Sequence, residues 1–134
     1  MYRITQTASN CRGGQFVGDT DRVVEELEPT LDAFIRNIAQ HGLTSQVELI
    51  KDYSFNVVWN KPISLLFIDG MHDYMNVARD FNHFNTWVNP GGYVAFHDYA
   101  DYFPGVMSFV NEVLAAGGYV ETGRAKSMIV LQKV

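Results

Sequence analysis

Apolar and polar positions along the chain follow two periods, and the change from one to the other marks the predicted elements. Residues 63–68 and 92–96 are short, nearly continuous apolar runs, which are typical of strands buried in a parallel sheet. Apolar residues at the helical spacing predict helices over 74–88 and 104–116. Asn89-Pro90-Gly91 predicts a sharp stop between the first of these helices and the second strand.

The rest of the chain continues this alternation of strands and helices. Its predicted elements are a short strand at 1–7, a loop at 8–20, a helix over about 21–42 that Pro29 kinks or restarts, a strand at 47–50, a turn or short helix at 55–60, and closing strands at 119–121 and 127–133 around a turn at 123–126. The alternation predicts a three-layer α/β fold whose sheet is mostly parallel with an antiparallel last strand. We expect residues 1–134 to form a single domain.

Composition narrows the class of protein. Hydrophobic residues make up 47% of the chain and charged residues 19%, which is ordinary for a globular protein. The net charge is −5 and the basic residues form no run, so we expect no nucleic-acid partner. Cys11 is the single cysteine, which excludes an internal disulfide and a cysteine-based zinc site and favours a cytoplasmic location. No apolar stretch approaches the ~20 residues of a membrane span, so no membrane association is expected.

Two predicted strands end on residues that can bind a metal or move a proton. Asp69 directly follows 63–68, with His72 three residues later, and Asp98 follows 92–96. Ligands of open parallel sheets lie outside the carboxyl ends of the strands, so the two carboxylates converge if the strands are neighbours. Carboxylate oxygens and water are the ligands that Mg²⁺, Ca²⁺ or Mn²⁺ prefer. His72 would then stand where it can remove a proton from a substrate hydroxyl bound to the metal.

In a simpler interpretation, the same residues have only structural roles. Asp69-Gly70 can form a turn, and Asp98 can cap the next helix. Two such strand ends, each with a histidine, favour the functional interpretation over this one. Other polar residues are predicted at the same rim: Asp73, His97, Tyr99 and Asp101.

Around these residues the chain resembles a known family. Residues 66–74, Leu-Phe-Ile-Asp-Gly-Met-His-Asp-Tyr, and residues 90–98, Pro-Gly-Gly-Tyr-Val-Ala-Phe-His-Asp, are similar to the class I S-adenosylmethionine-dependent methyltransferases. The branch they resemble is the metal-dependent O-methyltransferases, which include macrocin-type and macrolide-sugar enzymes, and the resemblance covers about 18–134. It implies a Rossmann-like sheet and methyl transfer from S-adenosylmethionine to a small-molecule hydroxyl.

The resemblance also assigns roles residue by residue. It implies that Asp69 and Asp98 bind Mg²⁺ or a similar divalent cation and that His72 is the general base. Tyr53 and Ser54, which follow the strand at 47–50, match residues that line the adenine pocket of the cofactor.

The chain departs from the family pattern in two places. Met71 stands where the family usually has an acidic residue, and no counterpart of the family's first strand and Gly-rich loop precedes the strand at 1–7. We therefore expect an N-terminally truncated member. The family's strand order is 3-2-1-4-5-7-6, so the lacking strand is central and the strand at 63–68 would expose an apolar edge. Either residues 1–7 fill the gap or a second chain covers it, and we predict a homodimer.

Three functions remain open from the sequence. The first is metal-assisted O-methyl transfer. The second is a non-catalytic binding or oligomerisation module derived from a methyltransferase. The third is a metal-assisted hydrolase that uses the same three residues, Asp69, His72 and Asp98.

Overall fold

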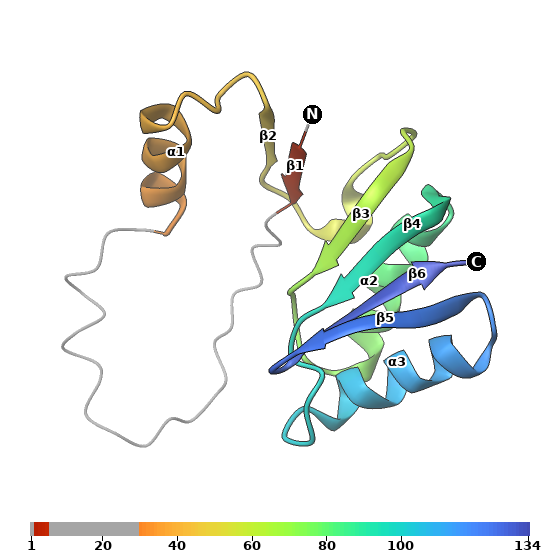
Figure 1. Ribbon diagram of the computed structural model, residues 1–134. Helices are drawn as coiled ribbons and strands as arrows, with labels where there is room; N and C mark the ends of the chain where they lie inside the picture. The colour runs from red at the N-terminus through yellow and green to blue at the C-terminus, as the bar shows by residue number, and fades with distance from the viewer. Residues whose placement is uncertain (1, 6–29) are drawn as a thin grey trace, which may run out of the picture. The chain divides into compact units, whose positions relative to one another are not determined.

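The computed structural model describes residues 2–5 and 30–134, which fall into two compact units, Met1–Asp52 and Tyr53–Val134 (Figure 1). The predicted loop at 8–20, with Cys11, and the first part of the helix predicted over 21–42 lie outside the described residues.

The first unit contains a two-stranded parallel sheet and one helix. Strand β1 (Tyr2–Thr5) pairs with β2 (Val47–Ile50), and helix α1 spans Thr30–Gln40. Gly42 follows the helix with a φ of 67°, a conformation that glycine adopts without strain, so the predicted helix stop is confirmed. β1 is hydrogen-bonded to β2 in a sheet of its own, whereas the strand at 63–68 belongs to the sheet of the second unit.

The second unit is built on a four-stranded mixed sheet. Its strands are β3 (Ile63–Ile68), β4 (Val88–Phe96), β5 (Tyr119–Ala125) and β6 (Met128–Lys133), in the order β3-β4-β6-β5. β3 and β4 are parallel, whereas β6 runs antiparallel to both β4 and β5. The predicted α/β fold with antiparallel closing strands is therefore confirmed, and the sheet places the ends of β3 and β4 side by side.

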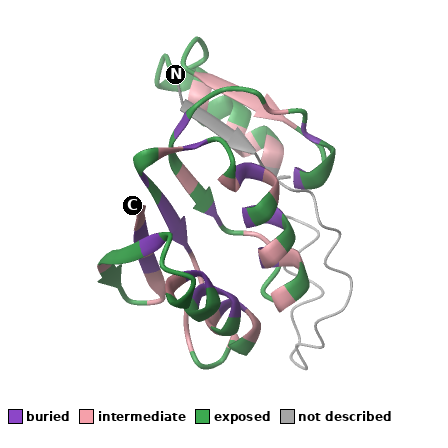
Figure 2. Ribbon diagram, turned by 90° about the vertical axis from the view of Figure 1, so that its right-hand side faces the viewer, coloured by how far each residue is buried: buried purple, intermediate pink, exposed green. Residues whose placement is uncertain are grey.

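Both helices of the second unit, α2 (Tyr74–Asn85) and α3 (Pro104–Ala115), pack on one face of this sheet (Figures 1 and 2). Phe96 is fully buried there and contacts the ring of Phe81 on α2 and that of Phe109 on α3, with ring centroids 5.8 and 6.2 Å apart. Burying a side chain of this size stabilises the fold by about 1.5–3 kcal/mol. This core fixes the two strand ends relative to the helices that follow them.

The other face of the sheet exposes large apolar side chains. Leu65 and Phe67 on β3 are 60% and 50% exposed, and Tyr93, which pairs with Leu65 in the register, is 40% exposed. Among the described strands, β3 pairs with β4 alone. None of the described helices has the length and apolar character needed to span a membrane.

Two predicted boundaries were wrong. The segment 89–91, predicted as a stop, lies inside β4, because pairing with β3 already begins at Val88. The register then moves from Ile63 opposite Val88 to Leu65 opposite Tyr93, so the Pro-Gly segment forms a bulge within the strand.

The turn predicted at 123–126 lies later in the chain. β5 continues to Ala125, and Lys126, with a φ of 53°, forms the turn into β6. The predicted turn or short helix at 55–60 is a single 3₁₀ turn over Ser54–Asn56.

Candidate functional site

The carboxyl ends of β3 and β4 meet at one edge of the sheet. The two strands are in parallel register, with Ile68 opposite Phe96, and the His97 backbone N–H donates to the Ile68 carbonyl at 3.0 Å. Asp69 and His97 are therefore the first residues after the last paired residues of β3 and β4. This arrangement brings together the two strand ends that the sequence marked.

Three side chains at this edge form a group that can hold a cation. His97 Nδ1 lies 3.4 Å from Asp69 Oδ1 and 2.9 Å from Asp98 Oδ2. One ligand atom from each residue lies within 4.8 Å of the other two. Asp69 is half exposed, with 50% of its side chain accessible, whereas Asp98 is 14% exposed. The group is thus open to a ligand on the side of Asp69.

The imidazole of His97 has an unsatisfied nitrogen. Nδ1 is shielded from solvent and lacks a hydrogen-bond partner, because its close contact with Asp98 is poorly aligned. A shielded polar atom without a well-aligned partner calls for an ion or another partner. The hydrogen-bonding approach of the Asp98 carboxylate at 2.9 Å, and more weakly the charge of Asp69, raises the pKa of His97. Two carboxylates and an imidazole nitrogen are a donor set that fits a divalent cation.

His72 contacts the same carboxylate oxygen of Asp98 as His97 does. Its Nε2 is 2.7 Å from Asp98 Oδ2, and its ring stacks on that of Phe103 with centroids 4.1 Å apart. The side chain is 45% exposed, so one face of the imidazole is accessible. Asp98 therefore links His72 to the group formed by Asp69 and His97.

The backbone at Asp98 is unusual. Its φ is 60°, which for a residue other than glycine costs of order 1–3 kcal/mol and is concentrated at functional sites. Asp98 does not cap the next helix, because α3 begins at Pro104 with Phe103 as its N-cap and no side-chain cap bond. The alternative in which Asp98 is a helix cap is therefore wrong.

Asp73, predicted at the same rim, has the capping role instead. It is the N-cap of α2, and its carboxylate accepts a hydrogen bond from the Asn76 backbone N–H at 3.0 Å. The hydrogen bond from the Asn76 side chain, together with backbone N–H groups, lowers the pKa of Asp73. This cap fixes the start of α2 directly behind His72.

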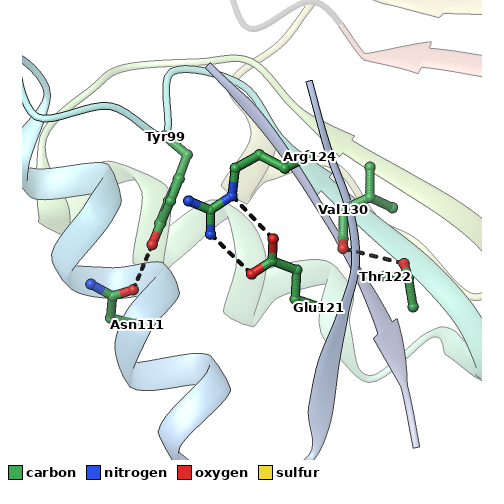
Figure 3. A network of polar contacts seen from close by, with 6 residues as sticks. All are labelled: Tyr99, Asn111, Glu121, Thr122, Arg124 and Val130. Atoms are coloured by element: carbon green, nitrogen blue, oxygen red, sulfur yellow. Dashed lines mark hydrogen bonds and ion pairs between the residues drawn. The ribbon is translucent and has the colours of Figure 1, made fainter. Parts of the chain in front are cut away.

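A polar network fixes the loop that carries Asp98 (Figure 3). The Tyr99 hydroxyl donates to Asn111 Oδ1 on α3 at 2.8 Å. The Arg124 guanidinium lies 4.7 Å from the centre of the Tyr99 ring and donates to both carboxylate oxygens of Glu121 at 3.0 and 2.9 Å. The residue after Asp98 is thus attached to both α3 and β5, which restricts the position of the carboxylate.

Of the predicted cofactor residues, Ser54 begins the 3₁₀ segment before β3 and Tyr53 is the N-cap of that segment. Ser54 is buried, and its hydroxyl donates to the Asp80 carboxylate on α2. Tyr53 is 48% exposed and stacks on Phe55 with ring centroids 5.2 Å apart. The Ser54 hydroxyl is therefore used inside the fold, whereas the Tyr53 ring is accessible to a ligand.

Ser54→Ala is expected to destabilise the second unit by about 1–3 kcal/mol, because it leaves a buried carboxylate without its donor. Burial already raises the pKa of Asp80, and the Ser54 hydrogen bond opposes that shift. A raised folded-state pKa of an acid contributes stability at low pH that is lost as pH rises through it. The substitution should therefore cost most at neutral pH and least near pH 4, as measured by urea unfolding at both.

Ser108→Ala, on the exposed face of α3, is the matched control and should change the free energy of unfolding by less than about 0.5 kcal/mol. An equal cost of Ser54→Ala at both pH values would contradict the role given to the Asp80 carboxylate.

A hollow of about 350 Å³ lies elsewhere in the second unit. Its lining comes from α2, α3 and the start of β5, and includes Phe81, Phe109 and Tyr119. None of the predicted site residues lines it. The convergence of chemical groups at the ends of β3 and β4 is therefore the stronger candidate for a functional site.

Comparison with known proteins identifies the family. A family model described as a methyltransferase domain matches residues 5–99, which include both strand ends. The chain belongs to this methyltransferase-domain family. An uncharacterized protein of Acanthamoeba polyphaga mimivirus is 44% identical over 91 residues, which are 59% of this chain and 40% of that protein.

Solved structures with the same fold include O-methyltransferases. The O-methyltransferase NovP matches with a TM-score of 0.68 and 19% identity, over 86% of this chain and 49% of that chain. A Staphylococcus aureus protein assigned as a caffeoyl-CoA O-methyltransferase gives 0.64 and 15%, over 80% and 61%. The Bacillus cereus O-methyltransferase in complex with SAH gives 0.58 and 16%, over 77% and 57%.

These comparisons confirm the methyltransferase resemblance at the level of family and fold. This methyltransferase-domain chain spans less than two thirds of the length of each of these relatives. The metal-dependent branch, the truncation and the roles of individual residues stay predictions.

Proposed function

We propose that this methyltransferase-domain chain transfers a methyl group from S-adenosylmethionine to a hydroxyl of a small molecule, with a divalent cation at Asp69 and Asp98. The observation that supports this function is the convergence of these two carboxylates with His72 at the ends of β3 and β4. The O-methyltransferase fold of the solved neighbours agrees with it.

Asp69 and Asp98 would hold the cation, and the exposed side of Asp69 leaves room for the acceptor hydroxyl. A divalent cation bound there would lower the pKa of that hydroxyl and orient it. Asp98 has a second role, because the same carboxylate contacts His72 Nε2. This contact fixes the orientation of the imidazole.

His72 is the proposed general base. With Nε2 facing Asp98 at 2.7 Å, Nδ1 is the nitrogen left to accept a proton. The acceptor oxygen forms a bond to the methyl carbon while the carbon–sulfur bond of the cofactor breaks, and the hydroxyl proton passes to His72. The products are a methyl ether, S-adenosylhomocysteine and protonated His72, which releases its proton to solvent.

Tyr53 is the proposed contact for the adenine ring. It is exposed and already lies in an aromatic stack with Phe55, whose other neighbour is the Arg79 guanidinium 4.1 Å from the ring centre. Flat aromatic faces bind a purine by stacking. Ser54 would contribute through its backbone, because its hydroxyl is engaged by Asp80.

The function is tested with radiolabelled S-adenosylmethionine and a panel of catechol and sugar hydroxyl acceptors, with a divalent cation and with chelator. We expect label in the acceptor only when the cation is present. Calorimetry measures cofactor binding separately. An absence of both heat and thermal shift at millimolar cofactor would remove the enzyme proposal for the isolated chain and leave a non-catalytic binding module.

A hydrolase that uses the same residues is tested with a panel of phosphate and ester substrates. Activity that is lost in Asp69→Ala would favour the hydrolase over methyl transfer.

We also propose that a second copy of the chain covers β3, which gives a homodimer. The support is the combination of an apolar outer face, with Leu65 and Phe67 at least half exposed, and a strand that pairs on one edge alone among the described strands. Sedimentation at micromolar concentration should give a dimer, and Phe67→Lys should shift it to monomer. A stable wild-type monomer would contradict the proposal.

A further inference from the structure

His97 lies at the proposed metal site but has no role in the mechanism proposed above. His97 lies against both carboxylates, with Nδ1 3.4 Å from Asp69 Oδ1 and 2.9 Å from Asp98 Oδ2. The nitrogen is shielded from solvent and lacks a hydrogen-bond partner. A nitrogen in this position is either protonated between two carboxylates or directed at a cation that all three groups share.

The spacing of the three ligand atoms fits a shared cation. Ligands about 2.1 Å from one ion lie about 3.0 Å apart at right angles and about 3.4 Å apart in a tetrahedron. The two distances from His97 Nδ1, 2.9 and 3.4 Å, match this range. The third pair, Asp69 and Asp98, stays within 4.8 Å.

The backbone supports the same arrangement. Side chains of an extended strand alternate between its faces, so His97 and Asp98 would point apart if β4 simply continued. The φ of 60° at Asp98 interrupts the alternation directly after His97. As a result, two consecutive side chains reach the same point in space.

We propose that His97 Nδ1 is the third protein ligand of this site and that it makes the site favour a first-row transition ion such as Zn²⁺ over Mg²⁺. The proposal rests on the proposed function only for the metal at Asp69 and Asp98. Mg²⁺ takes oxygen ligands, whereas an imidazole nitrogen suits Zn²⁺ and its neighbours. A site with this nitrogen among its ligands therefore prefers a different metal from a site that has oxygen ligands only.

His72 provides a matched control. It contacts the same Asp98 carboxylate through Nε2 at 2.7 Å, but it is not a member of the group of ligand atoms around Asp69. Removing His72 should therefore leave the metal preference in place.

The test is calorimetry on untagged protein, titrated separately with Zn²⁺ and Mg²⁺, for the wild type, His97→Ala, His97→Asp and His72→Ala. Zn²⁺ binds most sites more tightly than Mg²⁺, so the measured quantity is the change in the ratio of the two affinities. We expect His97→Ala to weaken Zn²⁺ binding about tenfold or more and Mg²⁺ binding less than about threefold. His97→Asp should lower the ratio about tenfold or more, because it restores an oxygen ligand.

Nitrogen NMR of labelled imidazoles identifies the ligand directly. Zn²⁺ should shift the His97 Nδ1 resonance and leave both His72 nitrogens without a coordination shift. His97→Asn replaces the alanine variant if the latter alters the circular dichroism spectrum.

The outcomes separate this inference from the proposed function. An unchanged affinity ratio in His97→Ala, or a coordination shift at His72 in place of His97, would overturn the inference and leave an oxygen-ligated site at Asp69 and Asp98. If neither Zn²⁺ nor Mg²⁺ binds to the wild type, the inference fails together with the metal in the proposed function. Methyl transfer that persists in chelator would then show that the transferase proposal survives without a metal.

Discussion

Gly105→Ala is expected to destabilise the second unit by about 2–3 kcal/mol and to displace His72. Gly105 lies in the first turn of α3, where a Cβ atom would stand 2.5 Å from the Tyr74 nitrogen, 2.9 Å from the Asp73 carbonyl carbon and 2.9 Å from the His72 oxygen. All three are backbone atoms, so no flexible side chain can move aside. Either α3 or the segment 72–74 must shift.

The expected loss of stability is larger than the gain that alanine gives through its higher helix propensity. Alanine is better than glycine within a helix by about 1 kcal/mol, so a site without the clash would gain stability from the same substitution. Urea unfolding measures the difference in the free energy of unfolding, provided that wild type and variant have the same dependence on urea concentration. A shift of the 72–74 segment should also weaken the contact between His72 and Asp98, which the chemical shifts of the His72 imidazole report.

Gly118→Ala is the matched control, because a Cβ atom there meets nothing within 4 Å. We expect it to change the free energy of unfolding by less than about 0.5 kcal/mol. The account of Gly105 would be wrong if the two substitutions had equal effects, since it rests on the close backbone approach of α3 to the site.

The parts of the site that were predictable from the sequence depend on local pattern. Two apolar runs identified β3 and β4, and the rule that ligands lie at the carboxyl ends of parallel strands then selected Asp69 and Asp98. The parallel register of the two strands confirms the juxtaposition that this reasoning required. Adjacent strands joined by one helix are a local arrangement, so a single sequence contains enough information to predict it.

The role of His97 was not predictable in the same way. The sequence places His97 at the rim but not among the ligands, and strand alternation alone would direct the side chains of His97 and Asp98 to opposite faces. The contact with Asp98 depends on the left-handed backbone of Asp98, which no residue type demands and which the contacts around Tyr99 fix from α3 and β5. The signal available in the sequence was the histidine–aspartate pair directly after a buried strand.

The cofactor residues show a second limit. Ser54 matched the family pattern, yet its hydroxyl is paired with Asp80, which lies 26 residues further along the chain. A polar residue after a strand suits both a ligand contact and a buried structural bond, and only the tertiary fold distinguishes the two. Bulges limit prediction in the same way. A Pro-Gly segment is typical both of the end of a helix and of a bulged strand, and in β4 it forms a bulge.

His72→Gln is expected to lower kcat for methyl transfer by about 10²–10⁴-fold, the usual contribution of a general base. Glutamine is close in size and can still donate a hydrogen bond to Asp98, so the carboxylate keeps a partner. It has no nitrogen that accepts a proton near neutral pH. The loss should therefore appear in kcat, while the dissociation constants of cofactor and metal change less than about threefold.

The pH profile separates proton removal from positioning. A rate that depends on a general base falls at low pH, and His72→Gln should remove this acid limb. His41→Gln, at an exposed position after α1, is the matched control and should leave both kcat and the profile unchanged. An acid limb that survives in His72→Gln would assign proton removal to another group at the site. Retention of the limb together with a large loss of kcat would make His72 a positioning residue for the Asp98 carboxylate.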